Sequence, residues 1–360
     1  MTETENLPCL FVNLTVIRDN VRAMVELCRN HDIEPIGVNK LTCESIDVAQ
    51  AFIEGGLKTI ADSRIQNLKK INHLPVEKLL LRLPQISLAH ETVAFADISL
   101  NSEERTLRAL SAAAVAQKKT HRVIVMHDLG DLREGCVTPE ETCALARLVI
   151  DLPGLALEGI GANLACYGGV EPTTENQSTL VALARQIEEQ TGHPIKTISG
   201  ASSAALFLLL RGGMPEGVNQ LRLGASLIMG FGLNDDPIPN TRQDAVKLGV
   251  ELIELKDKPS VPKHSTALDA MGRKPVFEDL GIHRRALGAI GEQDVSFTQL
   301  EPIDPGVKVL GASSDHLILD ITHSQSGYQL GDTVYFSLGY SGVLQCMTSQ
   351  YVGKKYGYWD

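Results

Sequence analysis

The 360-residue sequence lacks several features that would place it in common functional classes. No apolar run approaches the roughly 20 residues that a helix needs to cross a bilayer. The start of the chain has neither the basic region nor the apolar region of a secretion signal. Basic residues number 33 against 44 acidic ones, a net charge of −11, so no basic face favours nucleic acid. The seven cysteines include no CxxC pair, which argues against a zinc knuckle or a disulfide framework. We therefore expect a cytoplasmic protein that binds neither nucleic acid, membrane nor metal.

The length predicts two domains, because single cores rarely grow beyond about 250 to 300 residues. Up to residue 232 short apolar runs alternate with amphipathic segments, and NDDPIPNTRQD (234–244) then reads as a polar, Pro-rich linker. Short runs such as VKVLGA, DHLILDIT, GDTVYFSL and VLQCMTS follow, separated by turn residues and without helical periodicity. We expect one domain over 1–232 and a mainly β domain over 233–360.

The first domain contains nine apolar runs that could be strands. They lie at 10–14, 35–40, 58–64, 78–83, 96–100, 122–129, 155–164, 195–200 and 219–230. Runs that are apolar on both faces and alternate with helices are typical of a parallel sheet covered by helices. Nine is close to the eight strands of a TIM barrel, so we expect a (β/α)8 barrel. A doubly wound sheet is the alternative, although no GxGxxG motif follows the first run.

Two cationic side chains stand in apolar sequence at the ends of these runs. Lys40 ends PIGVNK; it is either a surface residue with a buried stem or a desolvated amine suited to Schiff-base chemistry. Arg222 lies inside NQLRLGASLIMG, where a buried arginine needs a carboxylate or a ligand as its partner. TIM barrels collect functional groups at the carboxyl ends of their strands, so we expect both residues at one mouth.

Small residues follow the last two runs of the domain. SGASSAAL places Ser199 and Ser203 before an apolar helix, and Gly224 and Ala225 follow Arg222. Such residues are either ordinary helix caps or an anion cradle, and TIM barrels often bind phosphate at this place. Together, Lys40, Arg222 and the anion cradle predict a pocket for a phosphorylated aldehyde cofactor, namely pyridoxal phosphate.

Two further loops carry polar side chains. HDLGDLREG (127–135) contains Asp128, Asp131, Arg133 and Glu134, and LEGIGANLACYGG (157–169) places Asn163 at a strand end. The alternatives are a charged surface loop with salt bridges for the first and a turn-capping residue for the second.

With these motifs assembled, the chain resembles the alanine racemase superfamily of fold type III pyridoxal phosphate enzymes, and within it the ornithine and broad-specificity amino acid racemase branch. The segments GVNKLTC, IADSRIQNL, HDLGDLREG, LACYGG, SGASSAAL, GASSDHLILD and MTSQYVGKK stand in the family's order over nearly the whole chain. The resemblance implies a barrel followed by a β domain. It also implies a homodimer in which the β domain of one subunit completes the other subunit's site.

The resemblance also implies residue roles. Lys40 matches the lysine that binds the cofactor covalently, Arg133 the arginine near the cofactor's phenolic oxygen and the substrate carboxylate, and Arg222 the arginine that faces the pyridine nitrogen. Asn163 falls where relatives place a histidine beside that arginine. The phosphate cradle corresponds to the Ser203 side chain and the amides of Gly224 and Ala225.

The chain departs from the family at the second proton donor. Alanine racemases supply a tyrosine in a GYADG-like segment, whereas this chain reads ALGAIGEQDV there. Asp315 and His316 lie on a loop that could reach the partner's site and are our candidates, together with Asp294; Tyr340 and Cys346 are more distant. Two other departures are Ala225, where the branch usually has Glu, and Glu44, where many relatives have Gly.

These observations predict a pyridoxal phosphate-dependent amino acid racemase that favours a cationic diamino acid such as ornithine, with alanine possible. Acidic residues near the expected mouth, Glu44, Asp128 and Asp131 among them, could receive a second ammonium group. The alternative enzyme is a lyase of the D-threonine aldolase or D-serine dehydratase type, which needs a metal. His316 and Asp320 have atoms that could bind a metal, but on a strand they would lie about 13 Å apart, too far to share one ion. The other alternative is a pyridoxal phosphate carrier, but those relatives lack a second domain.

Overall fold

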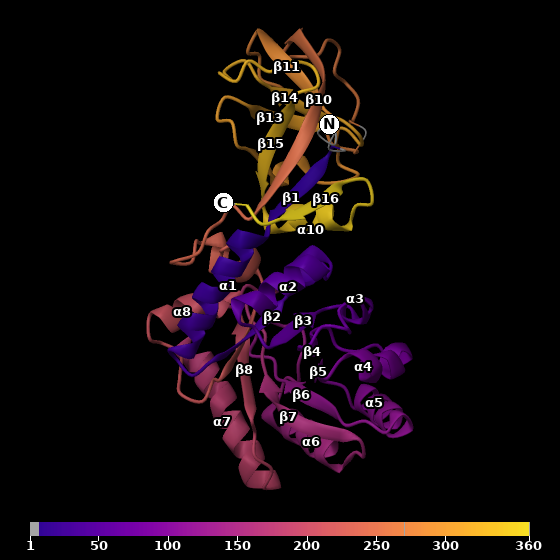
Figure 1. Ribbon diagram of the computed structural model, residues 1–360, viewed down its shortest axis with the longest axis vertical. Helices are drawn as coiled ribbons and strands as arrows, with labels where there is room; N and C mark the ends of the chain where they lie inside the picture. The colour runs from indigo at the N-terminus through magenta and orange to yellow at the C-terminus, as the bar shows by residue number, and fades with distance from the viewer. Residues whose placement is uncertain (1–6, 270, 360) are drawn as a thin grey trace. The chain divides into compact units, whose positions relative to one another are not determined.

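The computed structural model describes residues 7–269 and 271–359, which form two compact units (Figure 1). One unit comprises residues 16–243. The other is discontinuous in sequence and combines the described residues up to Thr15 with those from Asp244 onward.

The unit formed by residues 16–243 is a closed barrel of eight parallel strands. Each strand pairs with the next, and the last pairs with the first, so that Arg222 stands opposite Ile36. The expected (β/α)8 barrel is therefore confirmed, and the doubly wound alternative is wrong. The strands are β2 (Glu34–Val38), β3 (Thr59–Asp62), β4 (Glu77–Leu80), β5 (Ile98–Asn101), β6 (His121–Met126), β7 (Leu155–Gly161), β8 (Thr197–Ser202) and β9 (Gln220–Leu223).

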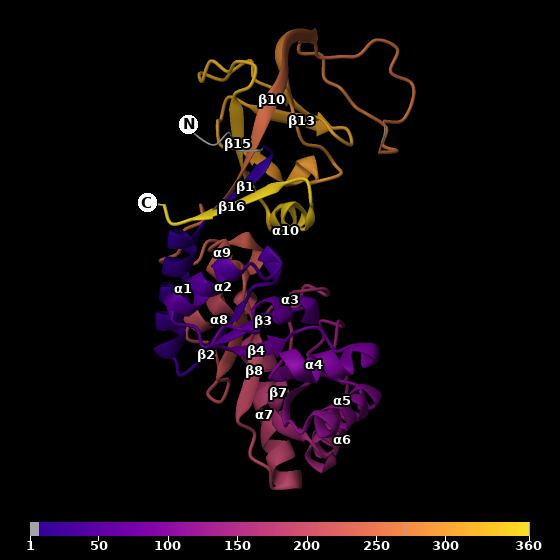
Figure 2. The ribbon, with the colours of Figure 1, turned by 45° about the vertical axis from the view of Figure 1, so that its right-hand side comes forward.

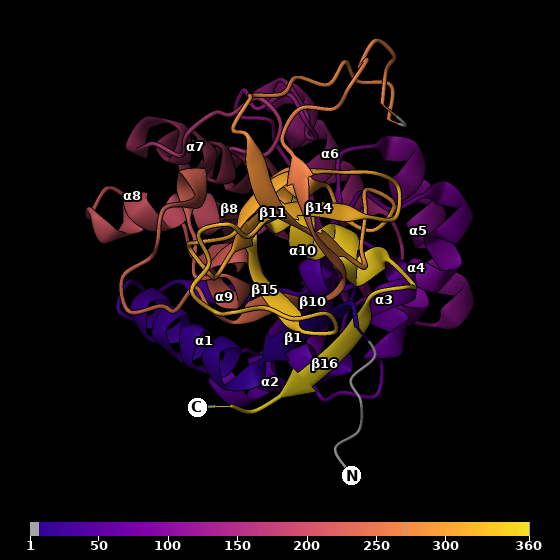
Figure 3. The same ribbon diagram turned by 90° about the horizontal axis from the view of Figure 1, so that it is seen from above.

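The helices of this unit lie in a ring in the view of Figure 3. They are α1 (Leu14–Arg29), α2 (Ile46–Gly55), α3 (Ile65–Lys70), α4 (Ala89–Phe95), α5 (Glu104–Gln117), α6 (Pro139–Asp151), α7 (Thr174–Thr191) and α8 (Leu206–Leu210). Local sequence sets their ends: α7 begins at a capping box between Thr173 and Asn176 and ends at Gly192, whose φ of 69° suits glycine. Among the described residues, no helix is both long and apolar enough to cross a membrane.

Apolar side chains fill the interior of the barrel. One buried cluster contains side chains from four different strands, namely Ile36, Leu79, Ile98, Ile124 and Met126. A second cluster lies between the strands and the helices α5 to α7, with Leu107, Val149 and Leu180 fully buried. The barrel is thus a packed core, and polar groups that could do chemistry belong at the strand ends.

The second unit is a largely antiparallel sheet with one helix (Figure 2). Its strands follow the order β12-β15-β10-β11-β14-β13, and β1 lies beside both β10 and β16. The elements are β1 (Cys9–Asn13), β10 (Val246–Pro259), β11 (Ile282–Gly288), β12 (Leu300–Pro302), β13 (Lys308–Ala312), β14 (Leu317–Asp320), β15 (Thr333–Leu338), α10 (Tyr340–Thr348) and β16 (Gly353–Gly357).

The structure differs from the sequence-based boundaries at three places. The run at 10–14, expected among the barrel strands, forms β1 and pairs with β10 and β16 of the β unit. The segment expected as a linker stays with the barrel as far as Gln243, because the Asn20 amide on α1 exchanges two hydrogen bonds with the backbone of Arg242, at 2.9 and 2.7 Å. VLQCMTS, expected as a strand, forms most of α10.

Candidate active site

The carboxyl ends of the barrel strands meet at one mouth because all eight strands are parallel. Lys40 opens a short 3-10 helix, η1 (Lys40–Thr42), directly after β2 and Asn39. Arg222 lies on β9, the neighbour of β2, and Ser203 follows β8. Asn163 and Arg133 lie in the loops after β7 and β6. The structure therefore brings the barrel residues expected from the sequence to the same end of the barrel.

The turn that carries Lys40 is fixed by the residue before it. Asn39 is fully buried; its amide nitrogen donates to Glu44 Oε1 at 3.1 Å and to the Ser45 carbonyl at 3.0 Å. The backbone N–H of Asn39 donates to the Ala61 carbonyl at 2.9 Å, and its own carbonyl accepts from the Thr42 hydroxyl at 3.3 Å. With its backbone held on both sides, Lys40 has a defined starting point for its half-buried side chain.

Glu44 is a buried part of this turn. Its φ of 54° lies in the left-handed region that favours glycine. The side chain is 1% exposed, and burial beside the Asp62 carboxyl raises the pKa of Glu44 to about 9. Burial also raises the pKa of Asp62. Burial therefore favours the neutral form of Glu44 and leaves little of its surface for a substrate ammonium, so its expected role as such a receptor stays a prediction without support from this geometry.

Asp62, at the end of β3, is a residue that the sequence did not single out. Its carboxylate accepts from the backbone N–H of Arg64 at 2.7 Å and from the Asn67 amide at 3.1 and 3.2 Å. It therefore anchors the start of α3. The only sequence signal was its position at a strand end, within IADSRIQNL.

Arg222 is buried, with 4% of its surface exposed. Its guanidinium donates to the Ala162 carbonyl at 2.6 Å, to the Ser199 carbonyl at 3.4 Å and to the Ser199 hydroxyl. Burial lowers its pKa to about 10, so the group still carries its charge at neutral pH. Its partners are carbonyl and hydroxyl oxygens, which orient the cation without neutralising it.

The small residues after β8 and β9 contact one another directly. The Ser203 hydroxyl accepts from the Gly224 amide at 3.2 Å and from the Ser226 amide at 3.3 Å, and it lies 3.0 Å from the Ser226 hydroxyl. Ala225 begins the four-residue helix α9 (Ala225–Ile228). A Cβ at Gly224 would come within 3.2 Å of the Val38 Cβ and 3.3 Å of the Val38 carbonyl, so glycine permits the close approach of β9 to β2. Of the expected cradle residues, Ser203 and Gly224 are thus in direct contact, with the Gly224 amide donating to Ser203, whereas Ser199 lies on β8 and accepts from Arg222.

The loop after β6 is organised by two aspartates. Asp128 Oδ1 accepts from the amides of Gly130 at 2.8 Å and Leu132 at 3.1 Å. Asp131, fully buried, accepts four amides of the loop after β7, at 3.0 to 3.3 Å. Both oxygens of Asp131 are occupied by backbone donors, whereas Asp128 uses one oxygen, so the geometry disfavours the expectation that Asp131 meets a substrate ammonium. The donors to Asp131 are the amides of Cys166, Tyr167, Gly168 and Val170.

Arg133 and Asn163 complete the barrel group. Arg133 forms an ion pair with its neighbour Glu134, and that hydrogen bond raises the pKa of Arg133. Asn163 is buried, and its amide nitrogen has no hydrogen-bond partner among the described residues. A buried donor without a partner is costly, so Asn163 is poised for an acceptor that the protein itself does not provide.

Asp315 and His316 belong to the β unit and not to the barrel group. Both side chains are exposed at the turn between β13 and β14. The Ser314 hydroxyl donates to Asp315 at 2.8 Å, and the His316 backbone N–H donates to the Ser313 hydroxyl at 3.2 Å. Asp294 accepts from the Ser349 hydroxyl at 2.6 Å. Burial raises the pKa of Cys346 to about 12, so this thiol holds its proton tightly.

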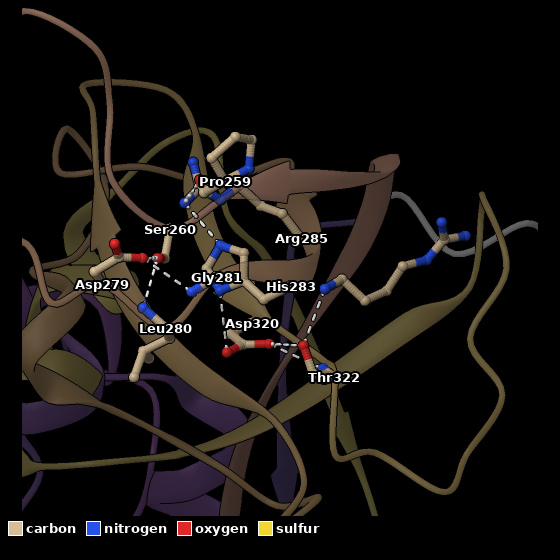
Figure 4. A network of polar contacts seen from close by, with 10 residues as sticks. Pro259, Ser260, Asp279, Leu280, Gly281, His283, Arg285, Asp320 and Thr322 are labelled. Atoms are coloured by element: carbon tan, nitrogen blue, oxygen red, sulfur yellow. Dashed lines mark hydrogen bonds and ion pairs between the residues drawn. The ribbon is translucent and has the colours of Figure 1, made fainter.

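Asp320, which the sequence offered with His316 as a metal pair, has other partners. Figure 4 shows its carboxylate between His283 and Thr322, with His283 Nδ1 at 3.2 Å. The second ring nitrogen of His283 accepts from Arg285 at 2.8 Å, which leaves the ring proton on Nδ1 for Asp320. Within the described ranges, no three His, Cys, Asp or Glu side chains form a group that could hold a metal ion.

The chain is similar to known proteins in sequence. The family model "Alanine racemase, N-terminal domain" matches residues 12–231. An ornithine racemase of Acetoanaerobium sticklandii is 39% identical over 97% of this chain and 99% of its own length. A lysine racemase of Thermotoga maritima is 37% identical over 97% and 98%.

Solved structures are similar in fold. An alanine racemase from Streptomyces coelicolor superposes with a TM-score of 0.74 at 16% identity, over 97% of both chains. A D-threonine aldolase from Filomicrobium marinum reaches 0.69 at 16% identity, over 95% of this chain and 89% of its own. At such low identity these two show the fold alone. The family model and the two racemases go further, and they establish that the chain belongs to the alanine racemase family, as its motifs indicated.

Proposed function

We propose that the protein is a pyridoxal phosphate-dependent amino acid racemase that exchanges the Cα proton and favours a cationic diamino acid such as ornithine. The observation that carries the proposal is the group of Lys40, Arg222 and Ser203 at one end of the barrel. The names of the two relatives that align over nearly the full length support the reaction and the class of substrate.

The residues at this end of the barrel fit pyridoxal phosphate. Lys40 offers a primary amine for the aldehyde, Arg222 a buried cation for the pyridine nitrogen, and Ser203 with the amides of Gly224 and Ala225 a polar turn for the phosphate. The unpartnered Asn163 amide is a donor for an acceptor on the cofactor. When bound, the cofactor would supply the electron sink that makes the Cα proton acidic enough to remove.

The side chains divide the remaining work. The Lys40 amine removes or returns the proton on one face of Cα. The fixed turn around Asn39 holds the Lys40 backbone in a defined position for this. Arg222 stays charged, with Nη1 donating to Ser199 and Nη2 to Ala162, so it contributes positive charge without giving up a proton easily. Arg133 is the cation available for the substrate carboxylate.

The donor for the other face stays a proposal. Asp315 and His316 of a second subunit are the candidates, in a homodimer whose β units complete each other's sites, and the cytoplasm is the expected compartment. Of the alternatives, a carrier without a second domain does not fit a chain that aligns with racemases over 97% of its length. The likeness to the aldolase concerns the fold only.

The test is reconstitution with pyridoxal phosphate followed by chiral chromatography of ornithine, lysine and alanine. Lys40→Ala should abolish both racemisation and the visible absorbance of bound cofactor. Lys58→Ala, an exposed lysine at the opposite end of a strand, is the matched control and should keep both. A wild-type chain that takes up no cofactor, or that racemises none of these amino acids, would end the proposal.

A further inference from the structure

Only some of the carboxylates near the barrel mouth are available to a substrate. Asp131 is saturated by four amides, Asp128 caps its own loop, and Glu44 is buried beside Asp62. Glu134 differs from these three, because its partner is the movable side chain of Arg133 and not the backbone.

Glu134 and Arg133 form a two-pronged ion pair. Nε and Nη2 of Arg133 each donate to one oxygen of the Glu134 carboxylate, which is the strong, parallel geometry of an arginine fork. The Glu134 side chain is only 12% exposed, against 38% for Arg133. Glu134 is also the opposing charge that acts most strongly on Arg222, so it lies within electrostatic reach of both site arginines.

The backbone holds Glu134 in place. The segment after it returns to β6, where the Cys136 amide donates to the Met126 carbonyl and the Asp128 amide to the Cys136 carbonyl, both at 2.9 Å. Gly135 has a φ of 129°, and a Cβ there would lie 2.6 Å from the Asp128 nitrogen. The carboxylate of Glu134 is thus presented from a tightly closed loop.

An arriving amino acid would compete for this pair. Its α-carboxylate would take over the donors of Arg133, and Glu134 would be left as a largely buried carboxylate without a partner, which is unfavourable. A diamino acid brings a second ammonium group that restores a partner to Glu134. Every charge is then paired before and after binding, whereas an amino acid with an apolar side chain leaves one charge unpaired.

We propose that Glu134 is a specificity-determining residue, which exchanges Arg133 for the side-chain ammonium of a diamino acid substrate. The inference rests on the proposed function, in particular on Arg133 as the receptor for the α-carboxylate. It explains a preference for ornithine or lysine over alanine by a residue that the family motifs did not assign.

The experiment compares each diamino acid with its uncharged counterpart. Values of kcat/KM for ornithine and norvaline, and for lysine and norleucine, are measured with wild type and Glu134→Gln. Substrate dissociation constants come from the change of cofactor absorbance on titration. Loss of one charge-assisted hydrogen bond should lower the ornithine-to-norvaline ratio by about 10- to 150-fold. Glutamine keeps an acceptor for Arg133, so norvaline itself should be handled equally well or better.

Two variants control the interpretation. Glu104→Gln removes an exposed glutamate paired with Arg108 on α5 and should leave the ratio unchanged. Glu134→Asp keeps the charge and should retain part of the preference, which a purely structural role would not predict. A Glu134→Gln ratio within twofold of wild type, or equal ratios for the Gln and Asp variants, would overturn this inference alone. A wild type without any racemase activity would overturn the proposed function and this inference together.

Discussion

Replacing Asp131 by Asn should loosen the loop after β7. Oδ2 of Asp131 accepts from the amides of Cys166 and Tyr167, and Oδ1 accepts from those of Gly168 and Val170. Asparagine retains one acceptor oxygen, and its NH2 group would face two N–H donors. Two hydrogen bonds to a charged group are lost, about 1.5 to 3 kcal/mol each. Since residues 166–169 are exposed, water can replace part of this, and we expect a net loss of about 2 to 4 kcal/mol.

The assay for this change is hydrogen exchange of the four amides, which reports the local opening free energy of the loop. Urea unfolding of the whole chain is a second measurement. Asp128→Asn is the matched control, because a single oxygen of Asp128 accepts both of its bonds and an asparagine oxygen can keep them. If the amides of residues 166–170 keep wild-type protection in Asp131→Asn, the reasoning is refuted.

Two further predictions follow from the residues around the site. The pKa of Glu44 is about 9 in the folded chain and about 4.3 in the unfolded chain. The stability that Glu44 contributes is therefore fully present below about pH 4.3 and is lost as the pH rises towards 9. The loss is at most about 1.4 kcal/mol per pH unit. Glu44→Gln should flatten this decline in urea titrations between pH 5 and 9, and an equally steep decline would contradict the buried neutral state. Gly135→Ala should destabilise the folded chain by about 2 kcal/mol or more. The new Cβ would clash with the Asp128 backbone, at a φ that already disfavours alanine. Gly130 has a φ of 103°, and a Cβ there would meet nothing within 4 Å, so Gly130→Ala measures the cost of the unfavourable φ alone. Equal losses of melting temperature in the two variants would contradict the proposed clash at Gly135.

The sequence predicted the barrel and its main site residues because both depend on local patterns. Strand ends in a parallel barrel converge whatever the details of packing, so Lys40, Arg222 and Ser203 could be grouped from their positions alone. The order of the family motifs supported the prediction of pyridoxal phosphate as the cofactor, which stays a proposal. The apolar run at 10–14 was assigned to the wrong sheet because its pattern is equally compatible with either, and only its pairing with β10 and β16 decides.

The contacts between polar side chains could not be predicted in the same way. Asp131, Asp128 and Glu44 look alike in the sequence as acidic residues near the mouth. Their roles diverge because one meets four amides, one caps its own turn and one is buried against Asp62. Such differences depend on distances across segments about 20 to 40 residues apart in the chain, and no single-sequence spacing encodes them.

The place of β1 has a consequence for how the chain is made. The partners of this strand, β10 and β16, begin 237 and 344 residues after it (246 − 9 and 353 − 9). Pairings of such separation form late, because the entropy of closing the intervening chain must be overcome first. During synthesis the whole barrel segment can leave the ribosome while β1, which precedes it in the chain, still has no strand paired to either of its edges. Assembly of the β unit must therefore wait until the residues of β16 have been synthesised.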